Sequence, residues 1–304
     1  MDALDFGIVA GLARSPRTTY GELGSRVGLS ANAVKARVHR MQSEGVLQGF
    51  AALPRPALLG CREGLLLFTG ADDADEREEE ILRGLAEVPG VRFIDISLDH
   101  SVWVWLLYRD EDDWERIERA AISLVGKPPA RGVRGDGRPA PTRALAPSDW
   151  KVLRALQPDG RAHAKDLAAR AGLTFKPLKR RLDTLLASGD VRVVPVVSPA
   201  DASGSVLFRV VAFLHPDAPP LEVEGGIVTA EAPGVVSVLA QRQTLREARA
   251  LQRDIAARPG IERAHLQVAT RRMALGWLDD ALARAATATA PAPATARVPL
   301  PKAR

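Results

Sequence analysis

The sequence contains a single cysteine, Cys61, and no apolar run near the roughly 20 residues that a membrane-spanning helix requires. One cysteine excludes a disulfide framework, a thiolate zinc cage and a Cys-x-x-Cys redox pair. The N-terminal stretch Met1-Asp2-Ala3-Leu4-Asp5 is acidic, whereas a secretory signal peptide would be basic. These absences predict a cytoplasmic protein with no membrane partner, whose folding depends on packing alone.

Motifs for metal binding, phosphate binding and nucleophilic catalysis are also missing. The 5 histidines are scattered without metal-ligand spacing, and no glycine-rich phosphate loop follows a strand. Cys61 has no partner with which a nucleophilic pair could be argued. We therefore expect no metal, no cofactor and no catalytic residue.

The sequence does contain an internal repeat. A shift of 144 residues, as from Asp5 to Asp149, aligns the chain with itself without a gap across about sixty positions. The same shift pairs Pro89-Gly90-Val91 with Pro233-Gly234-Val235, so the duplication extends further along the chain. Other identical pairs are Leu12/Leu156, Arg17/Arg161, Leu23/Leu167, Gly28/Gly172, Leu29/Leu173, Lys35/Lys179, Arg37/Arg181, Gly45/Gly189 and Gly60/Gly204.

Charge separates each repeat into unlike segments. Residues 1–60 carry 7 Lys and Arg against 4 Asp and Glu, and residues 145–200 carry 10 against 5. Residues 61–130 carry 8 against 17. Because phosphate would repel the acidic segment, a role in contacting DNA is expected only of the basic segments.

Both basic segments have the pattern of a helix-turn-helix unit. In the first, apolar residues recur at helical spacing from Leu4 to Leu12, and a short second helix runs from Tyr20 to Gly28. Ser30 is placed to N-cap a third helix, and Thr174 takes this position in the second segment. Residues 46–53 and 191–197 are predicted to be strands.

The third helix of each unit would present polar side chains outward, where they could reach base edges and phosphates in the major groove of duplex DNA. A compact three-helix unit can also be a protein-docking module, but the outward side chains are mostly hydrogen-bond donors, which favours DNA. The predicted DNA-binding residues are Ser30, Asn32, Lys35, Ala36, His39 and Arg40 in the first unit and Thr174, Lys176, Lys179 and Arg180 in the second. Arg181 is expected to support its helix rather than contact DNA.

The segments that follow have the pattern of a ferredoxin-like αβ plait. After the first unit we expect a strand at 64–69, a helix at 76–87, a hairpin of strands at 91–97 and 101–108, and a helix from Asp113. Residues 131–133 make an unconvincing last strand. The second plait is expected to be degenerate, with strands at 206–214, 235–240 and 261–268, a helix at 244–257, and no third strand.

The segment Leu29-Ser30-Ala31-Asn32-Ala33-Val34-Lys35-Ala36-Arg37-Val38-His39-Arg40-Met41, followed by Glu44-Gly45-Val46-Leu47, resembles the recognition-helix segment of the Lrp/AsnC transcriptional regulators. The order of elements resembles this family nearly throughout the chain, twice. The resemblance implies a sequence-specific DNA-binding regulator whose plaits mediate self-association and bind a small effector, such as an amino acid. Asp99 and His100 occupy the hairpin that the family places near its effector pocket, but the family's glycine is absent there and an ordinary polar turn is an equal alternative.

The expected fold class is therefore α+β, with two winged helix-turn-helix domains alternating with two ferredoxin-like αβ-plait domains. Siroheme decarboxylases resemble the same architecture, but their Tyr-Arg-rich segment and Tyr-Asn-Leu hairpin are absent from 97–108 and 235–246. A dimerisation scaffold that does not bind nucleic acid is the other alternative. The predicted boundaries are helix-turn-helix domains at 1–60 and 148–203, plaits at 61–130 and 204–280, a linker at 131–147 and a disordered tail at 281–304.

Overall fold

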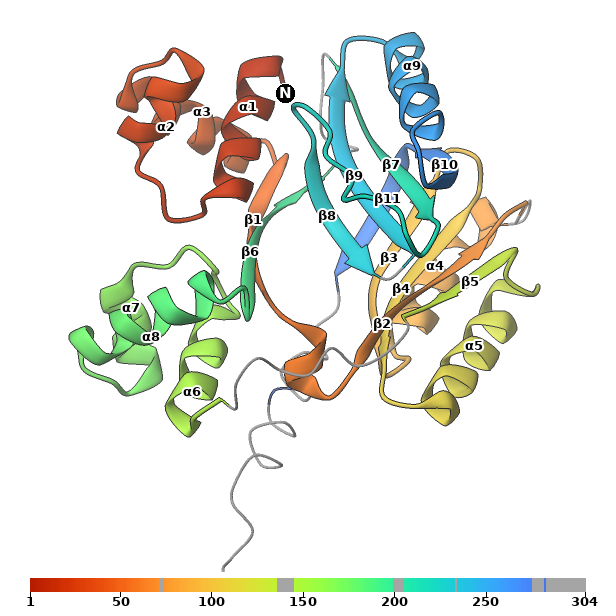
Figure 1. The fold of residues 1–304 in the computed structure, drawn as a ribbon, viewed down its shortest axis with the longest axis horizontal. Coiled ribbons are helices and arrows are strands. Elements are labelled where there is room, and N and C mark those ends of the chain that lie inside the picture. Colours follow the sequence, from red (N-terminus) through yellow and green to blue (C-terminus); the bar gives the residue numbers. More distant parts are fainter. Residues whose placement is uncertain (71–73, 136–144, 199–204, 233, 275–281, 283–304) are drawn as a thin grey trace, which may run out of the picture.

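The computed structural model describes residues 1–70, 74–135, 145–198, 205–232, 234–274 and 282. Figure 1 shows two three-helix heads on one side of the molecule and two packed sheets on the other. Each head is followed along the chain by strands of one sheet, so the same architecture occurs twice. The predicted α+β class and its repetition are confirmed.

Each head consists of three helices, and its second helix stops at a glycine. Gly28 has φ 72° and Gly172 has φ 62°, a left-handed conformation that favours glycine and ends the helix before the turn. The first head contains α1 (Ala3–Arg14), α2 (Tyr20–Val27) and α3 (Ala31–Ser43), and the second contains α6 (Pro147–Leu156), α7 (Ala164–Ala171) and α8 (Phe175–Ala187).

The strand that follows each head pairs with the strand that follows the other head. β1 (Leu47–Pro54) and β6 (Val191–Val197) form an antiparallel ribbon, in which Ala51 lies opposite Val194. Both strands were predicted, but their pairing across the two repeats was not. The ribbon joins the heads directly (Figure 1).

The first plait has the complete ferredoxin-like strand order β3-β4-β2-β5. A short 3-10 helix, η1 (Pro56–Leu59), leads into it. The prediction that this plait lacks a convincing last strand, and that residues 131–134 belong to a linker, is wrong, because β5 pairs antiparallel with β2. Its elements are β2 (Arg62–Phe68), α4 (Ala74–Ala86), β3 (Val91–Ser97), β4 (Val102–Tyr108), α5 (Glu111–Val125) and β5 (Arg131–Arg134).

The second plait has the equivalent strand order, which is β8-β9-β7-β10 when written in the same direction as that of the first plait. The prediction that it lacks a third strand is therefore wrong; the missing element is the first helix. Residues 215–226 contain no helix, and Pro216, Pro219 and Pro220 explain this because proline removes backbone donors and clashes with a preceding turn. Its elements are β7 (Val206–Leu214), β8 (Ile227–Ala232), β9 (Val235–Arg242), α9 (Leu245–Ala256) and β10 (Ile261–Gln267).

The last described strand crosses from the second repeat to the first. β11 (Ala269–Ala274) pairs antiparallel with β3, so the first sheet has five strands in the order β11-β3-β4-β2-β5. Backbone pairing along β3 covers an edge that would otherwise be open. This crossing was not predicted from the sequence.

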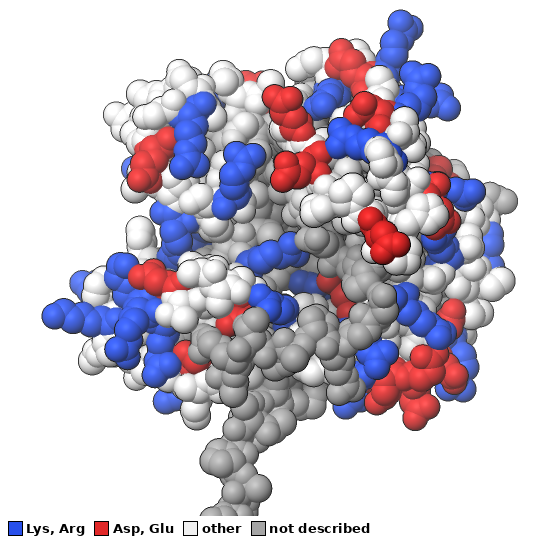
Figure 2. All heavy atoms as spheres, in the orientation of Figure 1, with Lys and Arg blue, Asp and Glu red and all other residues white. Residues whose placement is uncertain are grey.

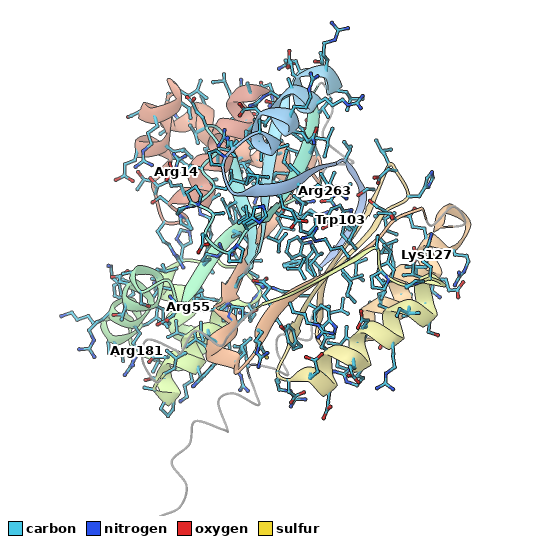
Figure 3. The ribbon with its side chains drawn as sticks, turned by 45° about the vertical axis from the view of Figure 1, so that its right-hand side comes forward. Arg14, Arg55, Trp103, Lys127, Arg181 and Arg263 are labelled. Atoms are coloured by element: carbon cyan, nitrogen blue, oxygen red, sulfur yellow. The ribbon has the colours of Figure 1, made fainter. Side chains whose placement is uncertain are left out.

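The two sheets pack face to face, with α4 and α5 outside the first sheet and α9 outside the second. Successive side chains of a strand point to opposite faces, so Leu65 and Leu67 of β2 face the second sheet while Leu66 and Phe68 face the helices. Trp103 of β4 lies with Phe213 of β7 in the layer between the sheets, where Figure 3 labels the tryptophan.

Charged and polar groups are buried in the same layer. Asp95 of β3 accepts a hydrogen bond from Arg209 of β7 at 3.3 Å, and these side chains are 1% and 4% exposed. The ring of His265 makes edge contacts with Trp103 and Phe213, and burial lowers the pKa of this imidazole. The sheet interface is thus fixed by a specific ion pair as well as by apolar packing.

Within the described part of the chain, no helix is long and apolar enough to cross a membrane, and no group of His, Cys, Asp and Glu could hold a metal ion. Of the segment predicted to be a disordered tail, 281–304, only Leu282 is described. Its side chain is fully buried in the core of the heads. The rest of that prediction lies outside the described residues.

Candidate nucleic-acid interface

The third helix of the first head presents its predicted contact residues to solvent. Ser30 caps this helix by accepting a hydrogen bond from the backbone N–H of Ala33 at 3.2 Å. Val34, Val38 and Met41 form the buried face, as their helical spacing predicted. All six predicted residues are exposed: Ser30, Asn32, Lys35, Ala36, His39 and Arg40.

A buried carboxylate anchors this helix to the first helix of its head. Asp5 is 1% exposed and accepts hydrogen bonds from Arg37 Nη1 at 2.8 Å and Arg40 Nη2 at 2.7 Å. Arg37 also bonds to Asp2, and the two carboxylates raise the pKa of its guanidinium. Arg40 is therefore tied to the core of the head while its side chain stays 48% exposed.

The second head repeats this anchor with the equivalent residues. Arg181 Nη1 donates to Asp149 Oδ1 at 2.9 Å, which confirms that Arg181 supports its helix. Thr174 occupies the N-cap position, but its side chain makes no capping hydrogen bond. Lys179 pairs with Asp183 at 2.7 Å on the surface. The predicted contact residues Thr174, Lys176, Lys179 and Arg180 are all exposed.

Exposed cations gather on the second head. Figure 2 shows them over the lower-left part of the molecule, where α7 and α8 lie. Lys165, Arg170, Lys176, Lys179 and Arg180 are all exposed. Positive potential on such a surface attracts polyanions.

The two heads are held to each other by a reciprocal pair of arginines. Arg17 of the first head donates to the carbonyl oxygens of Ala162 at 2.7 Å and Gly160 at 3.3 Å in the second head. Arg161 of the second head donates to the carbonyl oxygen of Thr18 in the first at 3.4 Å. Since Arg17 and Arg161 are equivalent in the repeat, the joint has approximate two-fold symmetry. The third helices are thus carried on one connected unit.

Comparison with known proteins matches both heads to one family. The model of the AsnC-type helix-turn-helix domain matches residues 1–42 and 147–186. The HTH-type transcriptional regulator LrpA of Pyrococcus horikoshii is 30% identical over 126 residues, which is 41% of this chain and 88% of the relative. The chain belongs to the Lrp/AsnC family of transcriptional regulators. The expected resemblance is confirmed, and two matched heads in one chain agree with a tandem duplication.

The other comparisons cover different shares of the chain. LrpA of Mycobacterium tuberculosis is 43% identical over 60 residues, or 20% of this chain and 40% of that protein. Among solved structures, Escherichia coli AsnC has a TM-score of 0.34 and 22% identity, covering 48% of this chain and 97% of its own. The siroheme decarboxylase NirDL has a TM-score of 0.49 and 13% identity, covering 94% of this chain and 98% of its own.

The residues expected near an Lrp/AsnC effector pocket form the turn between β3 and β4. Asp99 Oδ1 accepts hydrogen bonds from the Ser101 hydroxyl at 2.6 Å and from its backbone N–H at 3.2 Å. The Ser101 hydroxyl in turn accepts the indole N–H of Trp103 at 2.8 Å. His100 has φ 57°, a left-handed conformation in a turn. These bonds order the turn itself.

Two structural features of the candidate interface were not predicted from the sequence. One is the anchor from Asp5 to Arg37 and Arg40, and the other is the joint formed by Arg17 and Arg161. A signal was present, because the internal repeat preserves Asp5, Arg17 and Arg37 at their equivalent positions. The identical residues in the two copies of the repeat indicated that these positions matter, but not which residues they contact.

Proposed function

We propose that this chain is a sequence-specific regulator that binds duplex DNA through both heads of one molecule. The observation that carries the proposal is the pairing of β1 with β6, which fixes two helix-turn-helix heads on one ribbon. In helix-turn-helix dimers, two-fold pairing of this kind presents two recognition helices to successive half-sites. Here the second head is covalently attached, so no concentration-dependent encounter is needed to supply it.

The exposed residues of α3 and α8 take different roles in this proposal. Asn32 and His39 in the first head, and Arg180 in the second, are assigned to base edges, because amide, imidazole and guanidinium groups match hydrogen-bonding patterns in the major groove. Lys35, Lys176 and Lys179 are assigned to phosphates. Ser30, Ala36, Arg40 and Thr174 complete the proposed contact surface.

The two heads differ, so they are proposed to read different bases. The repeat aligns Asn32 of α3 with Lys176 of α8, Ala36 with Arg180 and His39 with Asp183, so the residues at equivalent positions differ. A symmetric dimer favours a palindrome because its two helices are identical. Unlike helices in one chain favour a site with unlike halves.

Replacing Lys35 and Lys179 with alanine together should weaken binding to duplex DNA about tenfold at moderate salt. Each lost phosphate contact should reduce the slope of log affinity against log salt concentration by about 1. Both side chains are exposed, and the Lys179–Asp183 pair is a surface pair worth at most about 1 kcal/mol. The melting temperature should therefore stay close to that of the wild type. Fluorescence anisotropy with labelled duplex across a salt series measures the slope.

A control variant with Arg249→Ala and Arg253→Ala removes the same charge from the exposed face of α9, away from the heads. It should bind DNA with nearly the wild-type salt slope. Equal losses in both variants would show that net charge alone governs binding and would contradict the assigned contacts. Unfolding of the lysine variant would show that the helix phasing is wrong.

A response to a small effector is part of the proposed function. Asp99 and His100 are retained as its proposed contacts because the turn that they form lies beside the second repeat, where the backbone N–H of Leu98 donates to the carbonyl oxygen of Val268 at 3.0 Å. We also propose that chains self-associate through the outer faces of the plaits. Contact with DNA by both heads of one chain does not require this self-association.

A further inference from the structure

The missing helix of the second plait leaves part of its sheet next to an open groove. In the first plait, α4 packs its apolar side chains on β3. In the second, the segment 215–226 replaces this helix, and Leu221 and Val223 cover part of the sheet. Val228 and Val238, on the same side of the sheet, line a groove of about 1250 Å³.

Three parts of the fold form the walls of this groove, and α1, α8 and β8 can be followed around it in Figure 1. The first wall is the end of α1 and its turn, at 10–17, and the second is the end of α8 with the start of β6. The third is the segment 221–228 of the second plait. Its apolar lining includes alanine, valine and leucine side chains from all three walls. Ligand pockets are typically about 300–1000 Å³ and mostly apolar, so this groove could hold a whole metabolite.

Arginines on the side of the heads give the groove its charge. Arg14, Arg17 and Arg192 all line it, and none of them makes an ion pair with a described residue. Arg14, labelled in Figure 3, lies on the first head, whereas Arg192 belongs to β6. Two arginines with no carboxylate partner among the described residues therefore line the groove together with Arg17.

Arg17 is the part of this site that is fixed in place. Its guanidinium is held by the carbonyl oxygens of Gly160 and Ala162, its Nε is buried without a hydrogen-bond partner among the described residues, and burial lowers its pKa. A partly buried cation of this kind is stabilised by a nearby anion.

The acidic residues of the groove offset only part of this charge on the side of the heads. Asp183 acts electrostatically on Arg17, but it is exposed and is also bonded to Lys179. Glu222 and Glu224 are exposed on the opposite wall, where water screens them. Arg258, also on that wall, is held by Asp254 and by the carbonyl oxygen of Glu222. The favourable position for an anion is therefore against Arg14, Arg17 and Arg192.

We propose that this groove is a second effector site, which binds an organic anion whose carboxylate, sulfonate or phosphate contacts Arg14, Arg17 and Arg192 while its apolar body covers Val228 and Val238. The site is distinct from the β3–β4 turn that contains Asp99 and His100. The regulatory consequence of this site rests on the proposed function, because the ligand would act on DNA binding. Binding of the ligand to the groove does not depend on the proposed function.

A ligand in this groove would contact the joint between the heads. Arg17 connects the two heads, and the ends of α1 and α8 belong to different heads. A ligand that touches both walls stabilises one relative position of the third helices. By thermodynamic linkage, bound DNA must then change the affinity for the ligand by the same factor as the ligand changes the affinity for DNA.

The test uses the full chain and 8-anilinonaphthalene-1-sulfonate, an aromatic anion whose fluorescence rises in apolar sites. N-phenyl-1-naphthylamine, which has the same rings without the sulfonate, is the neutral control probe. The variant Arg14→Ala with Arg192→Ala should bind the anionic probe at least about tenfold more weakly, since each charge-assisted hydrogen bond contributes about this factor. The same variant should bind the neutral probe almost as the wild type does.

Two further variants complete the test. Ala187→Trp fills the groove from an exposed position at the end of α8 and should weaken both probes. Arg249→Ala with Arg253→Ala removes equal charge from α9 and should change neither. Binding of the anionic probe that does not saturate, or that is equal in all variants, would overturn the site.

The DNA arm of the experiment separates this inference from the proposed function. Saturating duplex should shift the probe's dissociation constant about fivefold or more. A protein that binds DNA without any shift would contradict the coupling. Failure to bind any duplex, with the expected pattern of probe binding, would refute the proposed function and leave the ligand site supported.

Discussion

Replacing Asp95 with alanine should lower the free energy of unfolding by about 3 to 5 kcal/mol. The change leaves Arg209, which is 4% exposed, as a buried cation without the carboxylate that now lies 3.3 Å away. A buried unpaired charge destabilises the folded state because the protein interior solvates a charge much less well than water does. Urea denaturation followed by circular dichroism and tryptophan fluorescence would measure the loss, since Trp103 lies in the same layer.

The double variant Asp95→Leu with Arg209→Met removes both charges and is the matched control. Replacement of a whole buried ion pair by apolar residues is often neutral or stabilising, so the double variant should recover most of the lost stability. A single variant as stable as the wild type would show that this pair does not hold the sheets together. The same conclusion would follow if the double variant were no more stable than the single variant.

Replacing Asp5 with alanine should destabilise the first head by about 3 kcal/mol and weaken DNA binding with it. Asp5 is 1% exposed and accepts hydrogen bonds from Arg37 and Arg40 of α3, so its loss removes the polar link between the recognition helix and α1. Asp149→Ala should likewise destabilise the second head, since Arg181 of α8 donates a hydrogen bond to Asp149. Thermal denaturation and fluorescence anisotropy on the same samples would measure both effects.

Glu87→Ala is a suitable control, because Glu87 is an exposed carboxylate just after α4. Surface changes of this kind usually stay within about 0.5 kcal/mol. If Asp5→Ala and Glu87→Ala were equally stable, the anchor would contribute nothing beyond surface charge. If Asp5→Ala kept full DNA affinity, the anchor would not contribute to DNA binding, and this part of the prediction would be wrong.

The heads were predicted well because their signals are local. Helical spacing identified the buried faces, and Gly28 and Gly172 correctly indicated where the second helices end. The strand at 191–197 was predicted with its observed bounds. Its pairing with β1 could not be inferred, because nothing in either strand encodes a partner more than a hundred residues away.

The plaits show where sequence patterns become misleading. Residues 131–133 were judged an unconvincing strand, yet β5 pairs with β2 through its backbone, which requires little from its side chains. β8 was missed because the repeat aligned Val235 with Val91, the start of the second strand in the first plait. In the fold, β9 lies in the third position, and β8 takes the second. The signal was Ile227-Val228-Thr229, a β-branched run between glycine and proline turns.

The candidate interface was predicted in part. Exposure of the outward residues follows from helix phasing, and the structure confirms that exposure for all ten of them; their contact with DNA stays a prediction. The bond between Arg40 and Asp5 depends on how α3 crosses α1, which the sequence pattern does not specify. The groove beside Arg17 could not be foreseen either, because it arises from an absent helix and from the approach of both heads.

Hydroxyl-radical footprinting of the protein on its own upstream DNA, at concentrations where light scattering detects single chains, tests the central claim most directly. The account predicts that one chain protects two adjacent half-sites of unlike sequence. It further predicts that Lys35→Ala weakens protection of one half and Lys179→Ala that of the other, because each lysine lies on a different recognition helix. Protection of a perfect palindrome by a single chain, or loss of both halves equally in each variant, would contradict it.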